Sequence, residues 1–237
     1  MIRGRRYNFS DAVKMIDCVS LTLFGEMLFN FYGRCPEKGF DSIEHFVSDL
    51  LLSDEDKEKA LLRLNLLSVP LLSDAQNIFL KDPAATSVDE IIYSYPGFFA
   101  VFCHRVAHIM YDFDIALLAR MMSEYAHSLT GIDIHPGAVI QDGFAIDHGT
   151  GIVIGETAEI GQNVTVYHGV TVGAKGVVLS GQTKPDRKLK RHPTVERGCI
   201  ICAGAQIFGG NTVIGENSII SAGVKVVSSV PPGTVVH

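Results

Sequence analysis

A basic excess and a long apolar run are both missing from this sequence. The formal net charge is −6 at pH 7, whereas a protein that binds nucleic acid usually presents a basic face. No run approaches the ~20 apolar residues that a membrane span requires. The start of the chain has a basic head and an apolar stretch, but Asp11 and Asp17 interrupt that stretch and no small-residue cleavage site follows. We therefore expect an amphipathic helix over residues 11–31, in a cytoplasmic protein without a nucleic-acid or membrane partner.

Paired cysteines are also lacking. The five cysteines are an odd number and are scattered along the chain, which does not resemble a disulfide framework. Cys199 and Cys202 have the C-x-x-C spacing, but a redox or zinc role would need a second pair or a helix N-terminus, and the sequence offers neither. We expect Cys199 to fill a small-residue position in the repeat described below.

The first part of the chain has apolar residues at helical spacing and few glycines. Because 47% of all residues are hydrophobic and 19% are charged, a packed core is expected rather than disorder. We predict an α-helical domain over residues 1–130, with about six helices. Four of these helices can be placed, and Gly131 is a stop signal for the last. They are expected over residues 11–31, 54–67, 96–111 and 114–129.

The second part repeats with a period of six residues, which matches neither a helix nor a simple strand. Such hexapeptides are typical of a parallel β-helix, in which the aliphatic residue points into a triangular prism and a small residue four positions later allows a tight corner. The predicted inward residues are Ile134, Ile140, Ile146, Ile154, Ile160, Val166, Val172, Val195, Ile201, Ile207, Ile214, Ile220 and Val226. The sequence therefore predicts an α+β protein whose β-helix occupies residues 131–237, interrupted by a projecting basic loop at about 174–193.

His148 is the first candidate for chemistry. Asp133 precedes it by fifteen residues, and one coil is about eighteen residues, so the two fall on adjacent coils near the same edge. A carboxylate beside an imidazole fixes its tautomer and makes a general base near neutral pH. Gly149 and Gly151 would let a substrate approach the backbone closely. The alternative interpretation, a surface histidine, stays open.

Arg191 and His192 close the basic loop. A guanidinium suits bidentate capture of a carboxylate, although a solvated loop arginine fits the spacing equally. His168 could line the same edge as His148 or could be structural. Four other histidines are assigned to packing, to subunit contact or to the start of the β-helix, and they are His104, His108, His127 and His135.

Several short motifs together resemble the serine acetyltransferase family. They are D-I-H-P at 133–136, D-H-x-T-G at 147–151, G-E-T at 155–157 and R-H-P at 191–193, with D-P-A at 82–84, Y-P-G-F at 95–98 and Arg105 in the helical part. The resemblance covers about residues 75–233. Hexapeptides alone indicate the acyltransferase superfamily, and the combination with the D-P-A segment and a helical domain is more specific.

The resemblance implies a left-handed parallel β-helix and an enzyme that transfers the acetyl group of acetyl-CoA to the hydroxyl of L-serine, giving O-acetylserine for cysteine biosynthesis. His148 matches the family's catalytic base, and Asp133 matches the carboxylate that orients it. Acetyl-CoA is expected along the prism as co-substrate, without a metal. The backbone positions expected near it are Gly173, Ala203, Gly204 and Ala222.

The same resemblance assigns the substrate's charged groups. Asp82 and Asp147 match acids that hold the ammonium, whereas Arg191 and His192 match the pair that binds the carboxylate. The family's sites lie between subunits of a trimer, so we expect a homotrimer or a dimer of trimers. L-Cysteine is a candidate feedback inhibitor.

Several departures from the family pattern are visible. Ala174-Lys175 replaces the usual Gly-Thr beside the CoA site, and the basic loop is longer than in many members. The chain ends at Val235-Val-His237 without the isoleucine-ending tail that, in the family, inserts into the sulfhydrylase. Either the sequence is truncated there or the protein does not form that complex.

Three other functions are compatible with a prism. The first is an O-acetyltransferase for another acceptor, a sugar or a different hydroxy-amino acid; such enzymes generally lack the long helical domain. The second is a zinc enzyme of the γ-carbonic anhydrase kind, which needs H-x-x-x-x-H, and no histidine pair has that spacing. The third is an inactive scaffold, against which the intact Asp133, His148 and Arg191 argue.

Overall fold

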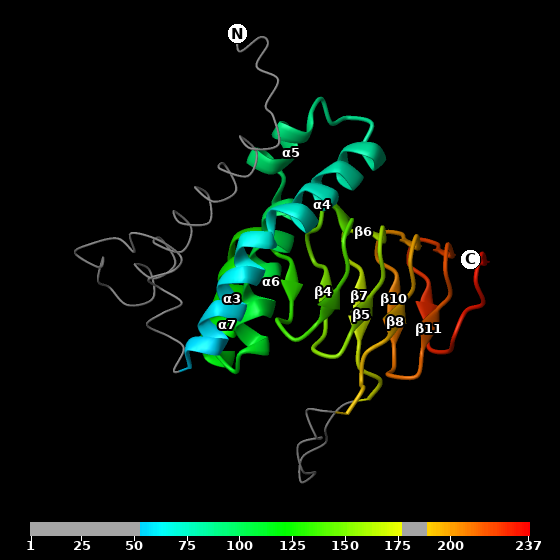
Figure 1. The fold of residues 1–237 in the computed structure, drawn as a ribbon. Helices are drawn as coiled ribbons and strands as arrows, with labels where there is room; N and C mark the ends of the chain where they lie inside the picture. Colours follow the sequence, from blue (N-terminus) through cyan, green and yellow to red (C-terminus); the bar gives the residue numbers. More distant parts are fainter. Residues whose placement is uncertain (1–52, 177–188) are drawn as a thin grey trace. The chain divides into compact units, whose positions relative to one another are not determined.

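The computed structural model describes residues 53–176 and 189–237 (Figure 1). The helix predicted over residues 11–31 lies outside these residues. By compactness the chain divides into two units, Met1–Ser68 and Val69–His237. In the first unit, α3 (Asp54–Leu66) begins at Ser53, whose hydroxyl accepts the Asp56 N–H at 3.0 Å. Acidic residues in the first turn also suit the helix dipole, which confirms the helix predicted there.

The other helices are α4 (Ser68–Lys81), α5 (Val88–Ser94), α6 (Pro96–Asp112) and α7 (Ala116–Thr130). The helices predicted over 96–111 and 114–129 are confirmed by α6 and α7. Pro96 at the first position starts α6, and Gly131, with φ 69°, ends α7 in the left-handed conformation that favours glycine. The change from helix to strand follows directly, whereas the compact units divide at Ser68, so the predicted domain boundary at residue 130 stays a prediction.

Three parallel sheets form the prism (Figure 1). Each of the first four coils adds one strand to each sheet, and the last coil adds a strand to sheets A and C only. Sheet A has the order β1-β4-β7-β10-β13, sheet B β11-β8-β5-β2, and sheet C β14-β12-β9-β6-β3. The strands are β1 (Asp133–Ile134), β2 (Val139–Ile140), β3 (Ala145–Asp147), β4 (Val153–Ile154), β5 (Glu159–Ile160), β6 (Thr165–Tyr167), β7 (Thr171–Gly173), β8 (Thr194–Val195), β9 (Ile200–Ile201), β10 (Gln206–Phe208), β11 (Val213–Ile214), β12 (Ile219–Ile220), β13 (Lys225–Val226) and β14 (Val235–Val236). The architecture is the left-handed parallel β-helix that the hexapeptides and the resemblance predicted.

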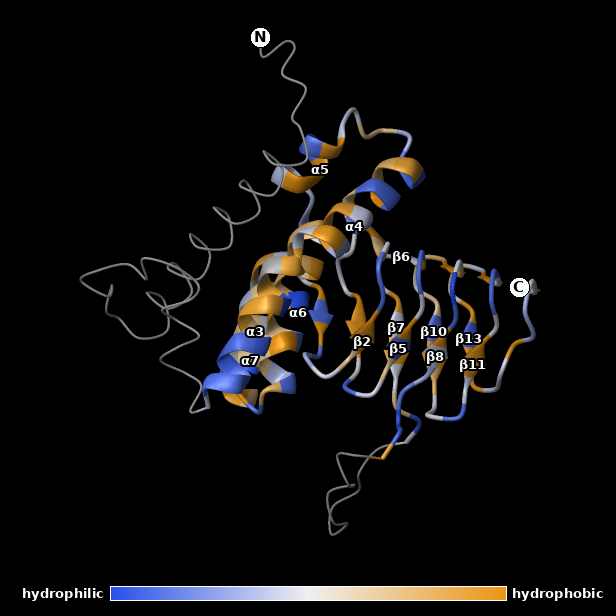
Figure 2. Cartoon of the chain, in the orientation of Figure 1, coloured by the Kyte–Doolittle hydropathy of each residue, from blue (hydrophilic) through white to orange (hydrophobic). Residues whose placement is uncertain are grey.

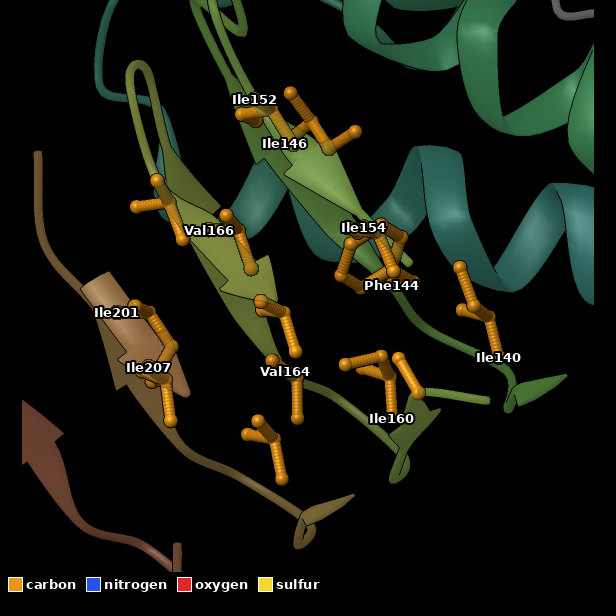
Figure 3. Close-up of a cluster of buried hydrophobic side chains, with 14 of the residues drawn as sticks. Ile140, Phe144, Ile146, Ile152, Ile154, Ile160, Val164, Val166, Ile201 and Ile207 are labelled. Carbon is orange, nitrogen blue, oxygen red and sulfur yellow. The ribbon is translucent and has the colours of Figure 1, made fainter. Parts of the chain in front are cut away.

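The core is a column of aliphatic side chains inside the prism. All the predicted inward residues are buried, the most exposed being Ile140 at 8%. Figure 3 shows side chains from the three faces, such as Ile154, Ile160 and Val166, pointing toward one another. In Figure 2 hydrophobic colour lies on the strands and paler or hydrophilic colour at many corners. Cys199 is fully buried at a corner, and its Sγ lies 3.2 Å from the Gly215 carbonyl oxygen, so its prediction as a small core residue is confirmed.

The helices of the second unit close the first coil of the prism. Ala100 and Val101 of α6 belong to the same buried cluster as the prism residues. A buried ion pair adds a polar connection: Arg105 of α6 donates to both oxygens of Asp74 of α4, at 2.6 and 2.7 Å. Arg105 also donates to the Ile140 carbonyl at 3.2 Å, and Asp74 accepts the Phe144 N–H at 2.8 Å. The pair therefore fixes two helices to the corner that follows β2.

Candidate functional site

Each corner of the prism joins two sheets, and we name the edges by those sheets. The C/A edge carries His148, which follows β3 and precedes β4. His148 has φ 58°, a left-handed conformation uncommon for a residue with a side chain, and its side chain is 74% exposed. Its Nε2 lies 3.8 Å from the Asp147 Oδ1, and its ring stands edge-on to the His168 ring at 5.7 Å. The expected imidazole is thus presented outward beside a carboxylate.

Asp82 belongs to the same neighbourhood. It follows α4, and its carboxylate accepts the Tyr95 hydroxyl at 2.6 Å and the Ala84 N–H at 2.8 Å. The Tyr95 hydrogen bond is the largest cause that lowers the pKa of Asp82, and the charge of His148 contributes. The same hydrogen bond raises the pKa of Tyr95 to about 12, with a smaller contribution from Asp147. Asp82 and Asp147 therefore supply two carboxylates close to one imidazole.

Asp133 stands at the start of β1 in sheet A, paired in register with Val153, directly past the C/A edge. Within residues 53–176 and 189–237 no hydrogen bond or ion pair joins Asp133 to His148, and the carboxylate that does contact the ring is Asp147. The role of Asp133 in orienting His148 stays a prediction.

Arg191 and His192 lie at the A/B edge, beside the corner between β4 and β5. Arg191 forms an ion pair with Glu156, which also accepts the Tyr111 hydroxyl at 2.9 Å. The Thr157 N–H donates to Nδ1 of His192 at 3.1 Å. Burial is the largest cause that lowers the pKa of His192, to about 4, so the ring is neutral at neutral pH.

A single chain therefore does not bring the two predicted halves of the site together. His148, Asp147 and Asp82 lie at the C/A edge, whereas Arg191 and His192 lie at the A/B edge, on the other side of sheet A. Sheet A separates them within one prism.

The predicted cofactor positions divide in the same way. Ala203 and Gly204 follow β9, and Ala222 follows β12, so these three lie at the C/A edge, on the coils beyond His148. Gly204, with φ 70°, lies in a column of left-handed glycines whose backbones stack: a Cβ at Gly169 would lie 3.5 Å from the Gly204 Cα, and the Gly204 N–H donates to the His168 carbonyl at 2.9 Å. This column leaves backbone accessible along the edge. Gly173, at the end of β7, lies on the opposite side of sheet A beside the Phe208 ring.

Sequence reasoning gave no role to several residues that shape these edges. Tyr95 lies in the motif Y-P-G-F and Thr157 in the motif G-E-T, and only these motifs could have indicated a functional role for them. Tyr111 and Asp74 had no such signal. The other histidines have structural settings: His104 is buried and stacks on His108 at 5.7 Å, and His135 accepts the Gly137 N–H at 3.0 Å.

The described residues contain neither a cluster of metal-ligating side chains nor a helix that could span a membrane. No group of three or more histidine, cysteine or acidic side chains there could hold a metal ion. None of the described helices is long and apolar enough to cross a bilayer.

Comparisons with known proteins give close sequence relatives. A serine acetyltransferase of Mycobacterium tuberculosis is 51% identical over 156 residues, which are 66% of this chain and 64% of that protein. One from Bacillus subtilis is 47% identical over 161 residues, 68% of this chain and 70% of that protein. A plasmid-encoded one from Synechococcus elongatus is 47% identical, and the chain spans 50% of its length. No family model matches the chain.

Solved structures that resemble this chain belong to the same family as the sequence relatives. Entamoeba histolytica serine acetyltransferase 1, in complex with L-cysteine, superposes with a TM-score of 0.73 at 33% identity and covers 96% of this chain and 76% of its own. The Neisseria gonorrhoeae serine acetyltransferase in complex with serine has a TM-score of 0.68 at 29% identity, covering 98% and 95%. The fold and these relatives define an acyltransferase of the hexapeptide-repeat class. Within that class, the chain belongs to the serine acetyltransferase family.

Proposed function

We propose that this protein is a serine O-acetyltransferase, which transfers the acetyl group of acetyl-CoA to the hydroxyl of L-serine and releases O-acetylserine and CoA. The observation that carries the proposal is the grouping of Asp82, Asp147 and His148 at the C/A edge of a serine acetyltransferase fold. An amino acid offers an ammonium, a carboxylate and, in serine, a hydroxyl, and each has a counterpart among the residues described above.

The ammonium is assigned to Asp82 and Asp147. Both are carboxylates near His148, and Tyr95 keeps Asp82 ionised by donating a hydrogen bond to it. The carboxylate is assigned to Arg191 and His192, because a guanidinium and a neutral N–H donor complement a carboxylate. With both ends fixed, the serine hydroxyl is oriented toward His148.

His148 is the general base. As the hydroxyl oxygen attacks the thioester carbonyl, Nε2 takes the hydroxyl proton and an oxyanion forms. Collapse of this tetrahedral species breaks the carbon–sulfur bond, and the imidazolium returns the proton to the leaving thiolate, so CoA departs as a thiol. Asp147, 3.8 Å from Nε2, stabilises the transient positive charge on the ring. Asp133 is assigned the orientation of His148 once substrate is bound.

Acetyl-CoA is placed along the C/A edge. The stacked left-handed glycines have no side chains to block a ligand there, and the edge leads from Ala222 and Gly204 to His148. Gly173 lies away from this path within one chain, so its contact is assigned to the acetyl-CoA of a neighbouring chain.

The complete site is composite. Since sheet A separates His148 from Arg191 within one prism, the C/A edge of one chain must meet the A/B edge of a second chain to form it. Three chains around a three-fold axis, each offering both edges, close such an arrangement. We propose a homotrimer, which can pair into a dimer of trimers. L-Cysteine shares the ammonium and carboxylate of serine and is proposed to compete for the same site.

The test is thiol release from acetyl-CoA with L-serine, compared with a panel of sugars and other hydroxy-amino acids, with and without L-cysteine. The proposal expects L-serine to be the preferred acceptor and His148→Ala to abolish turnover with the oligomer intact. Preference for a sugar would establish the alternative acceptor class, and near-normal activity of the His148 variant would refute the base assignment.

A further inference from the structure

We propose that Thr157 is a positioning residue for the substrate carboxylate: its hydroxyl holds the backbone of Arg191 and His192 and keeps the ring proton of His192 on Nε2. The inference deepens the proposed function and rests on it for the identity of the ligand.

One side chain makes three contacts at this corner. The Thr157 Oγ1 accepts the Arg191 N–H at 2.8 Å and the His192 N–H at 3.0 Å. It also lies 2.9 Å from Nδ1 of His192. The Thr157 carbonyl accepts from the Lys190 ammonium at 2.8 Å, so three successive residues at the end of the basic loop are bound to one threonine.

These contacts fix the tautomer of His192. The Thr157 backbone N–H, which can be nothing but a donor, points at Nδ1 at 3.1 Å, so Nδ1 carries no proton. The hydroxyl hydrogen of Thr157 then also points at Nδ1, while its oxygen lone pairs accept the two backbone N–H groups. A neutral imidazole without a proton on Nδ1 has it on Nε2.

The Nε2–H is available to a ligand. His192 is 8% exposed, and its Nε2 has no hydrogen-bond partner within the part of the chain that the structure describes. The contacts at Nδ1 hold the ring in place, and the ring packs closely over Gly155, where a Cβ would stand 2.1 Å from Nε2. A rigid, neutral N–H donor next to the Arg191 guanidinium complements a carboxylate and cannot act as an acid or base near neutral pH.

The matched experiment compares Thr157→Val, which removes the hydroxyl at nearly constant shape, with Thr157→Ser, which keeps it. Thr212→Val is the control, because Thr212 is buried and its hydroxyl donates to the Phe208 carbonyl at 2.8 Å and not to a group of Arg191 or His192. We expect Thr157→Val to raise KM for L-serine about tenfold, with KM for acetyl-CoA unchanged. Thr157→Ser should restore most of the affinity, and the Thr212 variant should leave both KM values as in the parent.

Two further measurements separate this role from a structural one. In a His192→Ala background, Thr157→Val should raise KM for L-serine by a smaller factor, because the imidazole that Thr157 contacts has been removed. The ¹⁵N spectrum of the histidine rings in the unsubstituted protein should show His192 protonated on Nε2 and not on Nδ1. A proton on Nδ1, an unchanged KM for L-serine in Thr157→Val, or an equal rise of both KM values would each overturn the proposal. If the unsubstituted protein does not acetylate L-serine, the proposed function fails, while the ring spectrum still decides what Thr157 does.

Discussion

Removing Asp74 from the buried Asp74–Arg105 ion pair tests how much this pair stabilises the packing of the helices against the prism. In Asp74→Ala, the Arg105 guanidinium, 8% exposed, loses two hydrogen bonds and its counter-charge. The Phe144 N–H loses its acceptor at the same time. The carbonyls of Ile140 and Gln141 still accept from Arg105, so part of its solvation remains.

The size of the effect follows from the burial. Breaking a buried ion pair by deleting one partner costs about 3–5 kcal/mol, because the remaining charge is left without compensation. Because two carbonyls still accept hydrogen bonds from Arg105, we expect Asp74→Ala to cost about 3 kcal/mol, the lower end of this range. For a unit of this length each kcal/mol lowers Tm by about 2–4 °C, so a fall of about 6–12 °C is expected.

The assay is calorimetric unfolding at fixed protein concentration, because assembly also shifts Tm. Asp142→Ala is the matched control: Asp142 is an exposed aspartate close to the pair, and its removal should change stability by less than about 0.5 kcal/mol. Replacing both partners, in Asp74→Leu with Arg105→Met, should recover most of the loss. A Tm for Asp74→Ala that matches the Asp142 control would show that the ion pair does not stabilise the fold.

Three other predictions address the edges and the core. Gly204→Val should raise KM for acetyl-CoA at least about tenfold, because φ 70° is strained for valine and the valine side chain would cover the C/A edge. The control is Gly233→Val, which introduces the same strain at φ 67° on the B/C edge and should leave KM for acetyl-CoA unchanged. Burial lowers the pKa of His104 well below its usual range, so its stabilising contribution is complete above pH ~6.5 and is lost as the pH falls. His104→Leu should therefore flatten the acid limb of the stability–pH curve measured by denaturant unfolding, and an unchanged slope would contradict this. Tyr95→Phe should let the pKa of Asp82 rise and weaken L-serine binding more at low pH than at neutral pH; a parallel pH profile of KM would argue against the assigned contact.

The core of the prism was predictable from sequence because the β-helix is built from repeated local units. Each inward residue meets its counterpart about one coil away, as Ile154 meets Val172 in register, so the period alone identifies it. The period is incomplete where its step changes. Over the eight residues from Ile146 to Ile154 it assigns no inward position to Ile152, which the structure shows fully buried.

The site was predictable in its residues but not in its contacts. Asp147 and His148 are adjacent in the chain, so their proximity needs no tertiary information. The contact of Tyr95 with Asp82 depends on how the turn after α4 meets the start of α6, and no hydrophobic period encodes it. Similarly, Thr157 meets His192 across a separation of 35 residues, through the coiling of the prism and the return of the basic loop.

In the proposed function, each site combines the C/A edge of one chain with the A/B edge of another. The direct measurement is activity after mixing His148→Ala chains with Arg191→Ala chains, with exchange verified through two affinity tags. Each variant alone should be inactive. After equal amounts of the two variants have exchanged at random, the whole population should regain about one quarter of the parental activity, because one interface in four pairs an intact His148 with an intact Arg191. Exchanged trimers without any regained activity would contradict the account.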